Sequence, residues 1–156
     1  MIDIAVPGTG DIRIEHLVFD YNGTLALDGK LLAEVRPRLY SLSNLLTLHV
    51  VTADTFGLAR DELEGIPCSL HILPSEDQVE AKRAFVNSLG AASVASFGNG
   101  RNDSGLLESS KIGVATLQAE GLAVESFVRA DIVCKSILDA LDLFLNPKRL
   151  VATLRS

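Results

Sequence analysis

The sequence contains no tryptophan, and aromatic residues make up only 5% of its 156 residues. Rings on which nucleic-acid bases could stack are therefore few. The formal net charge is −6, and the chain has no basic run. These deficits argue against nucleic acid as a partner. An anionic substrate must then be attracted by local cations and a metal ion, because the overall field does not draw it in.

Long apolar runs are also missing. No stretch reaches the length that crosses a membrane, so we expect no membrane partner. The first seven residues contain neither a basic segment nor a long apolar segment, and we therefore expect no signal peptide.

Cysteine and histidine are scarce. Cys68 and Cys134 lie far apart and lack the spacing of paired metal ligands, so we expect two reduced, buried thiols in a cytoplasmic protein. His16, His49 and His71 are scattered among apolar neighbours. This pattern favours structural or surface histidines over a metal site.

Short apolar runs alternate with amphipathic segments almost throughout the chain. An N-terminal hairpin is predicted to turn at residues 7–10, and strands are predicted at 16–20, 48–52, 66–73, 93–97, 111–116 and 131–134. A small β-excursion is expected at 25–31, and helices at 34–46, 55–64, 75–90, 103–110 and 136–145, with a short helix in the tail at 148–156. The third helix is expected to begin at Ser75, with Gln78 completing a capping box, and to end at Gly90. Strands separated by helices predict a single Rossmann-like α/β/α domain over residues 1–156, with a mainly parallel sheet.

Polar residues follow the expected strands at the point where each strand ends. The first run is Asp20-Tyr21-Asn22-Gly23-Thr24, and taken alone it also fits a tight hairpin turn at Asn-Gly. Two further clusters lie at residues 52–54 and 98–103, and Lys82 is on the helix before the second of these. Parallel strands bring such positions to one edge of the sheet. Together they supply a nucleophilic carboxylate, a hydroxyl, a cation and oxygen ligands suited to Mg²⁺, which is the set that phosphoryl transfer needs.

This ordered set resembles the motifs of the haloacid dehalogenase (HAD) superfamily, whose members are aspartate-nucleophile phosphohydrolases. The likeness is strongest to the phosphorylation domain of P-type ATPases and to the small proteins described as soluble P-type ATPases. It extends from about Leu17 to Ala140, with the four motifs at residues 18–25, 50–54, 82–90 and 97–115.

The resemblance implies a role for particular residues at each strand end. The expected catalytic residues are Asp20, Asn22, Thr52 and Lys82. The expected phosphate ligands are Asp20, Thr52, Ala53, Lys82 and Asn102. The expected Mg²⁺ ligands are Asp20, the backbone carbonyl of Asn22, Asn99 and Asp103.

Two positions depart from the family pattern. Asn22 stands where family phosphatases carry a general acid/base Asp, and the loss of such a group typically costs roughly 10²–10⁴-fold in rate. P-type ATPases also lack that Asp, and they keep a longer-lived phospho-enzyme. Asn99 replaces a metal-binding Asp, so the site has one negative charge fewer and we expect weaker Mg²⁺ binding.

No segment long enough to form a cap follows the first or second motif. The site should therefore be open, either to a phosphorylated small molecule or to a phosphate group on a larger partner. Closure by a second copy in a homo-oligomer is also compatible with an open site. We predict a slow Mg²⁺-dependent phosphohydrolase or phosphotransferase that acts through an aspartyl-phosphate on Asp20. The alternative is a catalytically weakened module of the same fold that binds phosphate or a partner.

Overall fold

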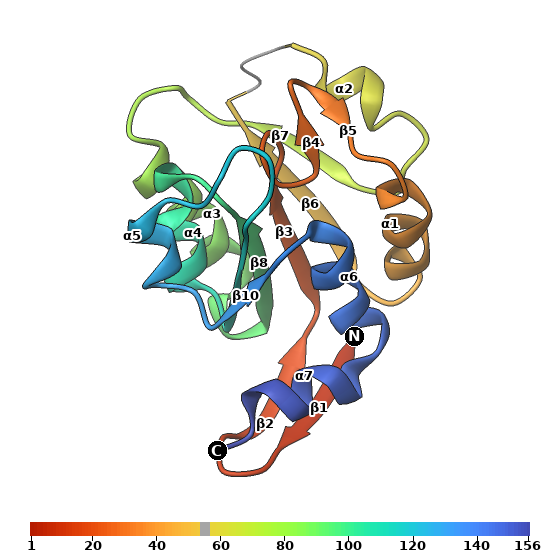
Figure 1. The fold of residues 1–156 in the computed structure, drawn as a ribbon, viewed down its shortest axis with the longest axis vertical. Helices are drawn as coiled ribbons and strands as arrows, with labels where there is room; N and C mark the ends of the chain where they lie inside the picture. The colour runs from red at the N-terminus through yellow and green to blue at the C-terminus, as the bar shows by residue number, and fades with distance from the viewer. Residues whose placement is uncertain (54–56) are drawn as a thin grey trace.

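The computed structural model describes residues 1–53 and 57–156, and at its centre lies a six-stranded sheet whose neighbouring strands are all parallel. Continuous apolar runs such as Leu17-Val18-Phe19 are typical of strands that are covered on both faces. The sheet order is β10 (Ile132–Cys134), β9 (Ile112–Thr116), β8 (Val94–Gly98), β3 (His16–Asp20), β6 (Thr47–Thr52) and β7 (Ser69–Ile72). The strand that carries Asp20 therefore lies inside the sheet, between β8 and β6 (Figure 1).

Helices cover both faces of this sheet (Figure 1). On one face α1 (Val35–Ser43) packs against α6 (Ile137–Leu145), and on the other α3 (Gln78–Leu89) packs against α4 (Ser104–Ser109). Each face has its own apolar cluster, the larger one beneath α1 and α6. The predicted three-layer α/β/α architecture with a mainly parallel sheet is confirmed.

Two hairpins lie outside the main sheet. The N-terminal hairpin pairs β1 (Ile2–Val6) with β2 (Gly10–Ile14), as predicted, and α7 (Pro147–Leu154) packs on β1. It projects from the body of the molecule beside the chain ends (Figure 1). The predicted β-excursion is the short pair β4 (Ala26–Leu27) and β5 (Lys30–Leu31).

The structure corrects several predicted elements. Helix α3 does not begin at Ser75: its N-cap is Asp77, whose carboxylate accepts the backbone N–H of Glu80. The Gln78 side chain donates to the carbonyl of Pro74 and completes no capping box. The predicted strand at 66–73 is regular only from Ser69, and the helix predicted at 55–64 is the shorter α2 (Ala59–Glu62).

The remaining differences between the predicted and observed elements lie where the sequence showed no helical pattern or where the structure does not describe the chain. The start predicted for α2, and Asp54 of the second motif, lie outside the described residues. A short helix, α5 (Val124–Phe127), was not expected, and 3₁₀ turns precede β8 and α4. None of the helices in the described part of the chain has the length and apolar character needed to span a bilayer. Both cysteines are free, Cys134 buried and Cys68 half-buried.

The three histidines that are scattered in sequence form a row across three neighbouring strands. Nδ1 of His16 lies 3.1 Å from Nε2 of His49, and Nδ1 of His49 lies 3.3 Å from Nε2 of His71. Burial lowers the pKa of His49 to about 4, and the two flanking histidines act in the same direction. Within the described ranges no three His, Cys, Asp or Glu side chains form a metal-binding group. The ring of Phe85 packs against His49 and His71, with centroids 5.6 and 4.5 Å apart, so we assign this row a packing role.

Candidate active site

The polar strand ends meet at one edge of the sheet. Asp20 ends β3, Thr52 ends β6 and Gly98 ends β8, and these three strands are direct neighbours. They border a cavity of about 290 Å³ at this edge. Its lining residues are Asp20, Asn22, Thr52, Ala53, Asn99, Gly100, Asn102 and Glu120. All the residues predicted as phosphate or metal ligands therefore line it, except Lys82 and Asp103.

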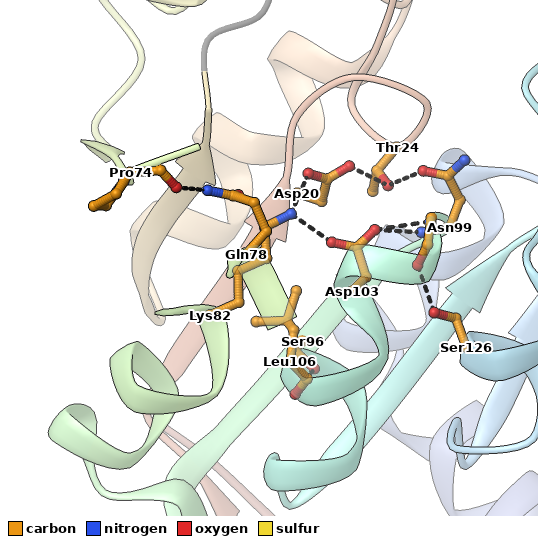
Figure 2. A network of polar contacts seen from close by, with 11 residues as sticks. Asp20, Thr24, Pro74, Gln78, Lys82, Ser96, Asn99, Asp103, Leu106 and Ser126 are labelled. Carbon is orange, nitrogen blue, oxygen red and sulfur yellow. Dashed lines mark hydrogen bonds and ion pairs between the residues drawn. The ribbon is translucent and has the colours of Figure 1, made fainter. Parts of the chain in front are cut away.

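A buried lysine joins two carboxylates beneath this cavity. The Nζ atom of Lys82 donates to Oδ1 of Asp20 over 2.7 Å and to Oδ1 of Asp103 over 2.6 Å (Figure 2). Lys82 is fully buried because it lies on the inner face of α3, one helical turn from the buried Val86. The ammonium group thus holds the Asp20 carboxylate in place.

Both carboxylate oxygens of Asp103 accept hydrogen bonds within the protein. Oδ1 accepts from Lys82, while Oδ2 accepts the backbone N–H groups of Asn99 and Gly100, both over 2.9 Å. The side chain has no exposed surface and does not line the cavity. Gly98 permits this packing, because a Cβ there would lie 2.5 Å from the Asp103 side chain. Asp103 therefore fixes the loop and Lys82 from behind the cavity.

Asn99 points its amide oxygen towards the Thr24 hydroxyl, which lies beside Asp20. The Nδ2 group donates to the carbonyl of Gly121 over 3.1 Å, which leaves Oδ1 facing the hydroxyl of Thr24 at 3.3 Å. The same hydroxyl lies 3.4 Å from Oδ2 of Asp20 (Figure 2). Thr24 thus sits between the two oxygens, although the sequence reasoning gave it no role.

The side chain of Asn22 is used to shape the first loop. Its Oδ1 accepts the backbone N–H of Gly29 over 3.0 Å, which ties the loop after Asp20 to the β4–β5 turn. A side-chain amide in this position neither gives nor takes a proton at neutral pH. The residue therefore lines the cavity as a loop anchor.

Burial and charge set the ionisation of the central groups. Burial raises the pKa of Asp20 to about 7, the Asp103 carboxylate acts in the same direction, and Lys82 opposes both. Burial lowers the pKa of Lys82, but the two carboxylates raise it more, and the pKa lies above its ordinary value. Lys82 is therefore charged at neutral pH, and any further cation beside Asp20 favours the ionised carboxylate.

Two residues in the loop after β9 complete the site, and no sequence motif pointed to either. Gln118 donates to the carbonyls of Gly23 and Thr24 over 3.1 and 3.0 Å, and its Oε1 accepts the N–H of Ile137 over 2.7 Å. Glu120 lines the cavity. Since β9 is not a neighbour of β3 in the sheet, only the path of this loop brings the two residues to the first motif.

No model of a known protein family matches the chain. Over 62 residues it is 44% identical to the uncharacterized protein MJ0073 of Methanocaldococcus jannaschii, a stretch that spans 40% of this chain and 67% of that protein.

Two solved structures show the same arrangement of elements. One, from Legionella pneumophila, is described as a HAD superfamily (subfamily III A) hydrolase; it has a TM-score of 0.72 and 17% identity, over 90% of this chain and 86% of that chain. The other is 3-deoxy-D-manno-octulosonate 8-phosphate phosphatase from Moraxella catarrhalis, in complex with a magnesium ion, a phosphate ion and a KDO molecule. It has a TM-score of 0.69 and 15% identity, over 91% of this chain and 94% of that chain. The chain therefore belongs to the same family as the archaeal protein, and its fold is that of the HAD superfamily phosphatases.

Proposed function

We propose that the chain is a phosphohydrolase or phosphotransferase that acts on phosphate esters through an aspartyl-phosphate on Asp20. One observation carries the proposal: the Asp20 carboxylate borders the cavity with Oδ1 fixed by a buried lysine, while Oδ2 lies 3.4 Å from the Thr24 hydroxyl. A carboxylate oriented in this way is suited to attack phosphorus in line.

The proposed reaction has two steps. An Asp20 oxygen forms a bond to phosphorus as the bond from phosphorus to the ester oxygen breaks, and the leaving alkoxide takes a proton. A water molecule then attacks phosphorus and gives a proton to solvent, the bond from phosphorus to the Asp20 oxygen breaks, and phosphate and the free carboxylate are released. Lys82 keeps Asp20 oriented and offsets the negative charge that develops. Asn22 cannot supply the proton, so a solvent water must do so, and we expect slow turnover.

The donor set around the cavity fits a divalent cation such as Mg²⁺. Asp20 offers a carboxylate oxygen, Asn99 an amide oxygen that faces the Thr24 hydroxyl beside Asp20, and Asn22 a backbone carbonyl, all of them hard ligands. When bound, the ion would neutralise charge on the phosphoryl oxygens. The magnesium and phosphate in the Moraxella catarrhalis phosphatase structure support this assignment.

We propose that the site resembles that of the P-type ATPase phosphorylation domain, because both lack the second Asp of the first motif. Thr52 and Ala53, which line the cavity beside Asp20, would bind the phosphoryl group together with Asn102. We expect the substrate to be a phosphorylated small molecule or a phosphate on a larger partner. The two free cysteines suit a reducing compartment such as the cytoplasm.

A second candidate function is a phosphate-binding module without turnover. The engagement of Asn22 with Gly29, and the neutral amide at Asn99, favour it. It predicts binding of phosphate or a divalent cation without product release.

The two candidates differ in whether Asp20 reacts. The pure protein should be treated with acetyl phosphate, with and without Mg²⁺, and followed by intact-mass spectrometry and phosphate release. We expect a Mg²⁺-dependent phospho-adduct that decays slowly, and no adduct in Asp20→Asn. Asp11→Asn, which changes an exposed aspartate on β2, is the matched control and should behave as the native chain does. A folded native protein that forms no adduct and releases no phosphate would support the binding module instead.

A further inference from the structure

Glu120 is a carboxylate at the cavity that no other described residue holds. It has no hydrogen bond or ion pair within the described ranges, and its side chain is exposed. Among the described residues that line the cavity, only Asp20 and Glu120 carry a carboxylate.

The loop that carries Glu120 is nevertheless fixed to the site on both sides. Gln118 binds the carbonyls of Gly23 and Thr24, and the N–H of Ala123 donates to the carbonyl of Asn99 over 2.9 Å. A turn between Gln118 and Gly121, closed by a 2.9 Å backbone bond, holds the residues between them. The backbone of Glu120 is thus held beside the first and fourth motifs, while its side chain is free to move.

The Glu120 carboxylate and the Asn99 amide lie on the same side of Gly23, around the position that a Cβ would occupy. A Cβ on Gly23 would lie 2.5 Å from Oε2 of Glu120 and 2.6 Å from Oδ1 of Asn99. Only a glycine at this position, where φ is +82°, leaves this gap open. The flexible Glu120 side chain is therefore within reach of an ion held by Asn99.

Charge balance shows what the site lacks. With Asp20 ionised, the buried group of Asp20, Lys82 and Asp103 carries a single net negative charge, and Asp103 is turned away from the cavity with both oxygens occupied. Asn99 contributes no charge. Mg²⁺ is usually held by one or two carboxylates together with water and substrate phosphate, and here Asp20 alone would have to serve both Lys82 and the ion.

We propose that Glu120 binds the divalent cation, directly or through one water, and supplies the negative charge that Asn99 does not carry. This inference rests on the proposed function, because it assumes that a cation occupies the cavity beside Asp20. In this assignment the loop after β9 contributes a cation ligand to the site.

The test measures cation binding rather than turnover. Mn²⁺ would be titrated into the native chain and its variants, with free Mn²⁺ followed by electron paramagnetic resonance, and Mg²⁺ binding would be measured by calorimetry. We expect Glu120→Gln to weaken the affinity roughly tenfold, the lower end of what outer ligands of metal sites contribute. Glu125→Gln is the matched control, because Glu125 lies five residues further on, does not line the cavity and pairs with Arg101 over 3.0 Å. Its affinity should equal that of the native chain.

A second variant tests whether the two positions share one charge. Asn99→Asp in the Glu120→Gln background should restore most of the lost affinity, since it places a carboxylate next to position 120, beside Gly23. Circular dichroism would verify that each variant is folded.

The contrary outcomes are distinct. If Glu120→Gln binds the cation with unchanged affinity, the inference is overturned and the proposed function stays intact. This holds even if turnover falls, because Glu120 would in that case act on the substrate or on a proton. If Glu120→Gln loses cation affinity and Asn99→Asp does not restore it, Glu120 does not supply the charge that Asn99 lacks. A folded native chain that binds neither Mn²⁺ nor Mg²⁺ would remove the cation site itself, and with it both this inference and the metal-dependent function.

Discussion

Replacing Lys82 by methionine removes the ammonium group that joins Asp20 and Asp103 inside the protein. Lys82 and Asp103 have no exposed surface, and the Asp20 side chain is only 10% exposed. Methionine keeps most of the volume of lysine, so packing changes little. What remains is two carboxylates, each of which has lost an ion-pair partner within 2.7 Å.

The cost is large because water does not replace the lost partner. Removing one member of a buried ion pair typically destabilises a protein by about 3–5 kcal/mol. Asp103 keeps its two backbone N–H donors, whereas Asp20 keeps one, from Tyr21, and a long 3.4 Å contact with Thr24. We therefore expect Lys82→Met to lower the free energy of unfolding by about 4 kcal/mol.

Asp20→Asn should behave differently, although it breaks the same ion pair. It leaves Lys82 paired with Asp103 and removes a carboxylate whose pKa burial has raised to about 7. A carboxylate with a raised pKa is disfavoured in its ionised form, so its removal should cost less than about 1 kcal/mol. In the double variant, Asp20→Asn should recover part of the loss caused by Lys82→Met, because one of the two facing charges is gone.

Urea unfolding at pH 7.5, followed by circular dichroism, measures these differences. With a typical m-value of about 2 kcal/mol/M, the Lys82→Met midpoint should fall by about 2 M. Lys148→Met, at an exposed position of α7, is the control and should leave the midpoint unchanged. A Lys82→Met loss below about 1 kcal/mol would refute the reasoning, and so would an equal loss in Asp20→Asn.

Three further predictions concern acid stability, turnover and packing. His49 has a folded pKa of about 4 against 6.5 when exposed, so the unfolded chain binds the extra proton and stability falls as the pH drops from 6.5 to 4; at pH 5 this amounts to about 2 kcal/mol. His49→Asn should flatten the dependence of the melting temperature on pH in this window, and an unchanged slope would contradict the assignment. Asn22→Asp should raise hydrolysis of p-nitrophenyl phosphate by roughly 10²-fold, and no gain in a folded variant would refute the role given to Asn22. Gly105→Ala places a Cβ 2.4 Å from the backbone oxygen of Val79, so the melting temperature should fall by an amount equivalent to about 1–3 kcal/mol; an unchanged melting temperature would show that α3 and α4 move apart freely.

Local sequence patterns were sufficient to predict an element wherever residues adjacent in the chain decide its bounds. The apolar run that ends at Asp20 predicted β3 with the observed bounds, His16–Asp20. Gly90 ends α3 at φ +90°, a conformation that glycine adopts without strain. Competing local signals were not resolved in the same way: Ser75 and Asp77 are both good N-caps, and the structure uses Asp77.

By itself the sequence determined the succession of most strands and helices along the chain and the polar groups at the strand ends. It also determined the absence of carboxylates at positions 22 and 99. Each of these depends on residue type and local spacing. Only the tertiary structure decided which of these groups meet. Lys82 reaches Asp20 across 62 residues, because α3 packs its inner face on the sheet. The same packing turns Asp103 away from the cavity, and the path of the loop after β9 brings Glu120 to it. Such contacts depend on strand order and helix packing, which no short stretch of sequence specifies.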